Sequence, residues 1–134
     1  MITYALDSNI ISYALKRDSQ IRKKIVEVTD CGDSLVMPYI VYFEVKRWLL
    51  EIGAKSKRLA FDRMLNNDII LKPLDKVVWD IAAALYVKRR KAGNPVSDAD
   101  LLIAAFAISN GCILVTNNIR HFADIEGLRI ENWK

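Results

Sequence analysis

Short apolar segments alternate with helical patterns along this chain of 134 residues, and that alternation restricts the fold more than any other feature. The β-prone segments are 2–6, 34–37, 69–74, 112–116 and 128–133. Apolar residues at helical spacing predict helices over 9–16, 19–30, 39–53, 57–68, 75–93 and 97–111. Strands separated by helices pair in parallel and are covered on both faces. We therefore predict a three-layer α/β/α fold with a central, mainly parallel sheet of about five strands.

Length and composition indicate one globular domain over 1–134. Hydrophobic residues make up 52% of the chain and charged residues 27%, which excludes a disordered chain. The longest apolar run, at 101–108, is too short to span a bilayer, and no signal-peptide pattern is visible. Cys31 and Cys112 form no C-x-x-C pair. We expect a cytoplasmic protein with reduced thiols and no membrane partner.

One carboxylate lies where the first predicted strand ends. Asp7 follows this strand directly, within "YALDSNIISY" (4–13). Ligands of parallel α/β sheets bind at the carboxyl ends of the strands, so we expect Asp7 at an active-site edge. An aspartate here is equally suited to cap the helix that follows it. The sequence leaves both interpretations open.

Three further acids are candidates for the same edge, although each also has a structural explanation. Glu44 lies in the middle of its helix beside Val41 and Trp48, where a charge is costly unless something pairs with it. Asp98 and Asp100 open a helix that is almost wholly apolar afterwards and should pack centrally. Taken singly, a favourable helix dipole explains the aspartates, and pairing with a nearby Lys or Arg explains the glutamate. Together, the acids could meet at one edge of the sheet.

Carboxylates held close together repel one another and stay ionised only when a cation neutralises them. Oxygen ligands without Cys or His suit hard divalent ions, so Asp7, Glu44, Asp98 and Asp100 predict a site for Mg²⁺ or Mn²⁺. Such ions activate water for phosphodiester hydrolysis.

The charge distribution favours a polyanionic partner. The formal net charge is +4, and Lys and Arg gather at 16–24, 55–58 and 88–91. Candidate contacts to a nucleic-acid backbone are Lys16, Arg17, Arg89 and Arg90. Basic clusters around an acidic metal site are consistent with a nuclease, although solvated helix faces explain the clusters equally well.

Four motifs, in order, give the chain a family resemblance. They are "LDSNIISYAL" (6–15), "YIVYFEV" (39–45), "DADLLIAAFAISNGCILVTNNIRHF" (98–122) and "IEGLRIENW" (125–133). In these motifs the chain resembles the PIN-domain ribonucleases, and among them the VapC-type toxins of toxin–antitoxin modules. The match covers essentially the whole chain, although 50–95 matches only in pattern. The resemblance implies a PIN-like fold and a single PIN domain over 1–134.

The resemblance also implies residue roles. Asp7, Glu44 and Asp100 match the three acids of the family that bind metal and support catalysis, and Asp98 matches a frequent additional acid. Cleavage by water would leave a 5′-phosphate and a 3′-hydroxyl. We expect the metal ion to be Mg²⁺ or Mn²⁺.

One position departs from the family. A fourth acid often follows the Thr of a T-N-D turn, but the turn here is "TNN" (116–118), so Asn118 replaces the acid. We therefore expect one tightly bound ion. Asn9, Thr116, Asn117 and Asn118 would support the acids, with the Thr116 hydroxyl bonded to Asp7, unless they are ordinary turn residues. His121, near another acid position of relatives, is either an RNA contact or an exposed loop residue.

The resemblance implies three partners. The first is structured RNA such as tRNA or rRNA, and the second is a cognate VapB-like antitoxin that inhibits the enzyme. The third is a second copy of the chain in a homodimer, which in some cases belongs to a larger toxin–antitoxin assembly. The antitoxin tail would cross the active site and place an Arg or Lys among the acids. Apolar residues of "FEVKRWLL" (43–50) and "RLAFDRML" (58–65) could supply the dimer interface.

Two other classes of function fit the sequence poorly. A phosphoreceiver domain needs an acid pair after its first strand, but Ser8 follows Asp7. A calcium loop over 7–18 would lack its central Gly and terminal Glu. Two alternatives within the PIN fold remain open: a binding module without nuclease activity and an RNA-processing nuclease that is not a toxin.

Overall fold

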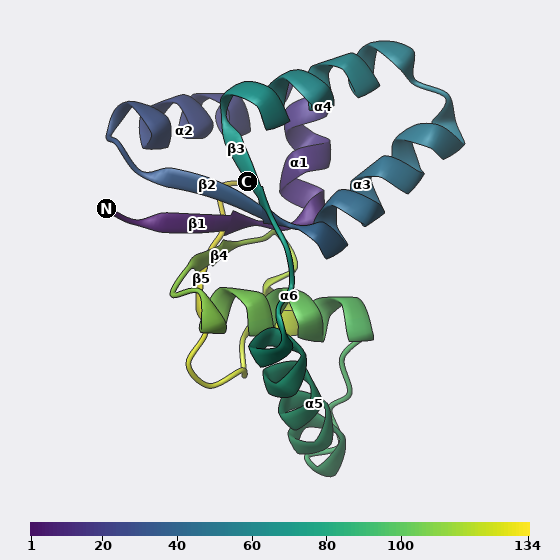
Figure 1. The fold of residues 1–134 in the computed structure, drawn as a ribbon, viewed down its shortest axis with the longest axis vertical. Helices are drawn as coiled ribbons and strands as arrows, with labels where there is room; N and C mark the ends of the chain where they lie inside the picture. Colours follow the sequence, from purple (N-terminus) through teal and green to yellow (C-terminus); the bar gives the residue numbers. More distant parts are fainter.

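A five-stranded sheet forms the centre of the protein, and the computed structural model describes all 134 residues around it (Figure 1). The strands are β1 (Thr3–Leu6), β2 (Ser34–Pro38), β3 (Ile69–Lys72), β4 (Ile113–Val115) and β5 (Arg129–Glu131). The helices are α1 (Ser8–Leu15), α2 (Ser19–Asp30), α3 (Tyr39–Ile52), α4 (Lys55–Asn67), α5 (Lys76–Lys91), α6 (Asp98–Ser109) and α7 (Ile119–Phe122).

The sheet order is β3-β2-β1-β4-β5, and every neighbouring pair is parallel. The chain builds outward from β1 through β2 to β3 and then returns to add β4 on the other side of β1. Leu6 at the end of β1 pairs with Val115 at the end of β4. The point between β1 and β4 is therefore a switch point, and the carboxyl ends of such strands form the usual ligand crevice.

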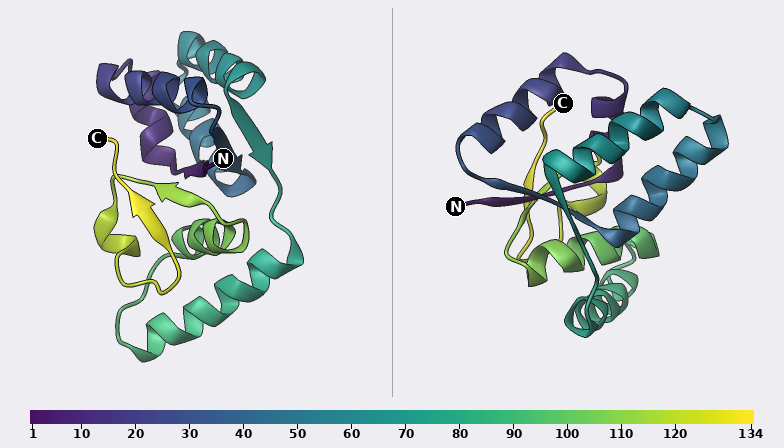
Figure 2. Two further views of the ribbon diagram at one scale, coloured as in Figure 1. Left: turned by 90° about the vertical axis from the view of Figure 1, so that its left-hand side faces the viewer. Right: turned by 45° about the horizontal axis from the view of Figure 1, so that its top comes forward.

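The helices form two layers, with α1 to α4 on one face of the sheet and α5 and α6 on the other (Figures 1 and 2). Helix α6 is buried from Leu101 through Ala107 because it lies between the sheet and α5, as its apolar sequence predicted. This burial fixes the direction in which its acidic first turn points. No helix is long and apolar enough to cross a membrane.

The predicted fold class is confirmed, and the sheet is wholly parallel. All predicted strands and helices are present, with ends that shift by a residue or two. The sequence predicted no helix between the segments 112–116 and 128–133, yet α7 lies there. A helix of four residues is too short to show a helical repeat of apolar positions, so periodicity could not have found it.

Candidate active site

Asp7 lies at the switch point, directly after β1. Its backbone N–H donates to the carbonyl of Val115 at 2.9 Å, which continues the pairing of β1 with β4. Its side chain is also the N-cap of α1, because one carboxylate oxygen accepts the backbone N–H of Ser8 at 2.7 Å. The residue is only 2% exposed. Asp7 thus caps a helix and also occupies the ligand-binding edge of the sheet.

Two side chains fix the other carboxylate oxygen of Asp7. The buried Thr116 hydroxyl donates to it at 2.7 Å, so the hydrogen bond expected between these two residues is present. The amide of Asn9 donates to the same oxygen at 3.4 Å. The Thr116 hydroxyl in turn accepts the backbone N–H of Asn118 at 3.0 Å. Each oxygen of Asp7 therefore has a donor attached to the rigid sheet edge or to α1.

Asn117 and Asn118 connect the turn after β4 to α1 and to Thr116 by hydrogen bonds. The backbone N–H of Asn117 donates to Asn9 Oδ1 at 3.1 Å, and its side-chain amide donates to the Tyr13 hydroxyl at 3.0 Å. Asn132 near the C-terminus donates to Asn117 Oδ1 at 3.2 Å. Asn118 contributes its backbone N–H, and its exposed side chain makes no capping bond to α7.

Glu44 extends from α3 toward the same edge. Its Oε1 atom is buried and has no hydrogen-bond partner. Burial raises the pKa of Glu44, the charges of Asp7 and Asp100 raise it further, and Arg47 opposes this shift. Burial is also the main cause of the raised pKa of Asp7, to which Asp100 adds, while bonds from Thr116 and Ser8 lower it. The three acids are therefore close enough to influence one another.

The first turn of α6 separates its two acids. Ser97 is the N-cap, and its hydroxyl accepts the backbone N–H of Asp100 at 3.2 Å, so neither acid caps the helix. The Asp100 side chain is 15% exposed, and its charge raises the pKa values of Asp7 and Glu44. Asp98 is exposed and lines a pocket with Trp79 and Tyr86 of α5. Asp98 does not contribute to the pKa shifts of Asp7 or Glu44.

His121, the only histidine, is brought to the acids by α7. Its Nδ1 lies 2.8 Å from Asp100 Oδ2, and its side chain remains 56% exposed. A residue predicted as an RNA contact is thus a direct partner of an acid. Sequence reasoning could not have placed it, because only the unpredicted α7 turns its imidazole toward α6.

The acids fit a hard divalent cation by their chemistry. They offer only oxygen ligands, two of them have raised pKa values, and Glu44 Oε1 lacks any other partner. No group of three or more His, Cys, Asp or Glu side chains stands ready to ligate an ion, so these side chains would have to close around it. Such closing is compatible with side chains that repel one another without an ion.

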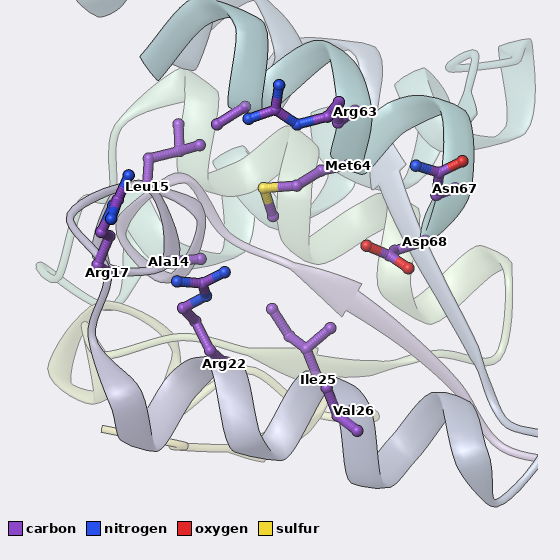
Figure 3. A pocket seen from close by; sticks show the side chains of 11 residues that line it. Ala14, Leu15, Arg17, Arg22, Ile25, Val26, Arg63, Met64, Asn67 and Asp68 are labelled. Atoms are coloured by element: carbon purple, nitrogen blue, oxygen red, sulfur yellow. The ribbon is translucent and has the colours of Figure 1, made fainter. Parts of the chain in front are cut away.

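The predicted phosphate contacts lie in three different places. Lys16 ends α1, with its ammonium 5.5 Å from the centre of the Trp48 ring. Arg17 has a positive φ of 63° and lines a cavity of about 470 Å³ between α1, α2 and α4 (Figure 3). Arg90 is exposed at the end of α5, whereas Arg89 beside it is buried. They do not form one basic stripe.

The cavity in Figure 3 has apolar residues and a rim with more cations than acids. Arg17, Arg22 and Arg63 lie around Ile25 and Met64, Asp68 adds one acid at the α4 side, and Asp7, Glu44 and Asp100 do not line the cavity. This cavity is therefore separate from the acidic edge and lies between α1, α2 and α4.

Known sequences share the length and pattern of this chain. The family profile described as PIN domain matches residues 4–128. A Salmonella typhimurium protein named tRNA(fMet)-specific endonuclease VapC is 31% identical over 142 residues, covering 99% of each chain. Ribonuclease VapC2 of Rickettsia felis is 28% identical over 135 residues, covering 97% of each.

Solved structures share the fold over the same extent. A structure of VapBC2 from Rickettsia felis, bound to a DNA fragment from its promoter, superposes with a TM-score of 0.91 at 25% identity, covering 99% of this chain and 100% of that one. DNA-bound VapBC from Salmonella typhimurium gives a TM-score of 0.87 at 26% identity and covers 100% of both chains.

Proposed function

The chain belongs to the PIN domain family, in its VapC branch, and we propose that it is a metal-dependent endoribonuclease, the toxin of a toxin–antitoxin pair. The observation that carries this proposal is the convergence of Asp7, Glu44 and Asp100. These acids come from the end of β1, the middle of α3 and the first turn of α6; Asp7 and Asp100 both raise the pKa of Glu44, and Asp100 raises the pKa of Asp7. The whole chain, 1–134, would act as a single PIN domain in the cytoplasm.

Asp7, Glu44 and Asp100 would hold Mg²⁺ or Mn²⁺, with Asp98 assisting from the rim. When bound, the ion neutralises the carboxylates, polarises the scissile phosphate and acidifies a water molecule. Because Asn118 replaces a fourth acid, we expect one tightly held ion.

The protein's own groups supply orientation. Thr116, Asn9 and the Ser8 backbone hold both Asp7 oxygens in fixed directions, so Asp7 needs little rearrangement when it binds. Glu44 Oε1 has no competing bond and is free to accept a hydrogen bond from the attacking water. Loss of the 3′-oxygen as leaving group would give a 5′-phosphate and a 3′-hydroxyl.

The substrate proposed is structured RNA such as tRNA or rRNA, in line with the tRNA-specific endonuclease name of the Salmonella relative. Sequence-specific RNA recognition usually targets exposed single-stranded loops of structured RNA. Lys16 and Arg17, at the C-terminal end of α1, would contact the RNA backbone at a distance from the cleaved bond.

A VapB-like antitoxin is the proposed inhibitor, because the structural relatives are complexes named VapBC. Its cationic tail would neutralise the acids in place of the metal ion. The cavity with Arg17, Arg22 and Arg63 suits an antitoxin segment with apolar and acidic side chains (Figure 3). In a homodimer, exposed Phe43 and Leu59 of the predicted interface segments would be covered.

The test is cleavage of total RNA by the purified protein without antitoxin, in Mg²⁺, in Mn²⁺ and in EDTA. Discrete fragments should form with either ion and disappear with Asp7→Asn, Glu44→Gln or Asp100→Asn. Asp62→Asn, an exposed acid of α4, is the matched control and should cleave normally. Intact RNA under every condition, with the protein folded, would favour the binding module and make Asn118 the first position to restore to Asp.

A further inference from the structure

Arg89 is a buried charge without a partner. It is 7% exposed in the last turn of α5, and its Nε has no hydrogen-bond acceptor. None of the ion pairs in the chain includes it. A guanidinium does not lose its proton in a protein, and an uncompensated buried charge is strongly unfavourable. The structure thus holds a largely buried cationic group that no carboxylate of the chain neutralises.

The guanidinium lies at a pocket of about 320 Å³. The pocket is lined by Tyr86, Arg89, Arg90, Pro95, Val96 and Leu101. Arg90 is held there by Tyr86: its Nη1 donates to the tyrosine hydroxyl at 2.7 Å, and its guanidinium carbon is 5.9 Å from the ring centre. Two arginines therefore share one pocket, and neither meets a carboxylate.

A second, apolar pocket of about 400 Å³ adjoins the first, because both are lined by Tyr86 and Leu101. It contains Trp79, which is 53% exposed, and it reaches Asp98 at the start of α6. The loop from α5 leads directly into this turn (Figure 2). The two pockets thus run from the arginines toward the acidic first turn of α6.

We propose that the paired pockets form a nucleotide-binding subsite of the RNA substrate. Arg89 and Arg90 bind a backbone phosphate, and the rings of Tyr86 and Trp79 stack on the adjoining base. Guanidinium groups match phosphate oxygens in geometry, and exposed aromatic rings beside them are typical of single-strand recognition. This inference rests on the proposed nuclease function and adds a contact away from the cleaved bond.

If Arg89 serves RNA binding and not the fold, replacing it should not lower the stability of the free protein. Arg89→Met keeps the apolar stem and removes the buried charge, so the melting temperature of the free protein should stay the same or rise. The same variant should bind RNA more weakly. If Arg89 served only the fold, its loss would lower the melting temperature and leave RNA affinity alone.

The experiment measures binding of a short fluorescein-labelled single-stranded RNA by anisotropy, with every protein in the Asp7→Asn background so that the RNA stays intact. Arg89→Met should weaken binding about tenfold, because a charge-assisted hydrogen bond is lost. It should also flatten the dependence of log K on log salt by about 0.7, as for one released counter-ion on a single strand. Lys76→Met, at the exposed start of the same helix, is the control and should match the parent.

Unchanged RNA affinity in Arg89→Met overturns the proposal. So does a shift from dimer to monomer in light scattering without a change in RNA affinity, because the pocket would then face a second copy. In the native background, Arg89→Met should raise KM and leave kcat unchanged. A native protein that cleaves no RNA would defeat the proposed function, while the binding arm would still test the subsite separately.

Discussion

Two aspartates at the starts of helices have opposite electrostatic environments. Asp18 caps α2 and pairs with the Lys134 ammonium, and this pairing lowers its pKa. Asp7 caps α1 in the same way, but burial and the charge of Asp100 raise its pKa. One acid has a cation from its own chain, and the other lies among acids. A helix cap therefore does not identify a functional acid; the absence of an internal counter-charge does.

The C-terminal region and the acidic edge differ in the same respect. At the C-terminus, Gln20 donates to the carbonyls of Trp133 and Lys134 at 2.9 and 3.1 Å, and Lys134 pairs with Asp18. At the acidic edge, Glu44 Oε1 has no partner. The polar groups of the C-terminal region thus find partners within the chain. The Glu44 oxygen at the acidic edge does not, as expected for a site that binds a cation.

The largest effect expected in this comparison concerns Thr116, the donor that orients Asp7. Thr116→Val keeps the shape and removes the hydroxyl, so kcat for RNA cleavage should fall about 10- to 100-fold, as for other groups that orient a metal ligand. Thr29→Val is the control, because the Thr29 hydroxyl bonds only to its own helix, at Ile25 and Val26. Equal activity of the two variants would mean that Asp7 needs no orienting bond.

Stability should respond to pH with opposite signs at the two sites. An acid whose pKa is higher in the folded than in the unfolded protein binds protons more readily when folded. Glu44 is such an acid, so its ionisation reduces stability as the pH rises from about 4.3, the unfolded value, through the raised folded-state pKa. Asp18, with a lowered pKa, stabilises the fold above about 3.9 and loses this effect as pH falls.

Melting curves of metal-free protein test these signs. Glu44→Gln should melt like the wild type at pH values well below 4 and above it at neutral pH. Asp18→Asn should match the wild type at low pH and melt slightly lower at neutral pH. If Glu44→Gln were destabilised at neutral pH, Glu44 would have an internal partner and the contrast between the regions would fail.

His121 is expected to have a smaller effect. His121→Ala removes the partner of Asp100 Oδ2, and kcat should fall by about tenfold or less, in line with a single exposed hydrogen bond. Arg120→Ala, in the same short helix, controls for damage to α7. A loss as large as that of Asp100→Asn would instead place His121 among the ligands.

The smallest effect should come from Lys134. Lys134→Ala breaks its pair with Asp18 at the surface, so the melting temperature should fall only slightly and RNA cleavage should not change. A large loss of cleavage would show that the C-terminus supports the acidic edge through Asn132 and Asn117.

The strands, the helices and the three acids were predictable because each depends on a local pattern. Apolar alternation identifies strands and helices, and parallel topology brings Asp7 to the carboxyl edge of the sheet. The exposed position of Asp98 was harder to predict, because two positions along a helix turn its side chain through about 200° from that of Asp100. His121 depended on α7, which is too short to have a pattern.

Arg89 shows a signal that was present but not used. Val78, Ala82 and Leu85 follow helical spacing along the face of α5 that packs on the core, and Arg89 continues that spacing. The run "KRRK" (88–91) was predicted to be either a solvated face or a set of phosphate contacts, yet its second member, Arg89, is buried. Extending the apolar stripe by one turn would have distinguished Arg89 from its neighbours.

Thermal unfolding of the metal-free protein during titration with Mn²⁺ tests the central claim most directly. Without metal, Glu44→Gln should melt above the wild type, because one of three mutually repelling charges is gone. Added Mn²⁺ should raise the wild-type melting temperature in proportion to the logarithm of its concentration above Kd, and should raise that of Glu44→Gln much less. Equal melting temperatures without metal and equal shifts with it would contradict the claim that the three acids form one cation site.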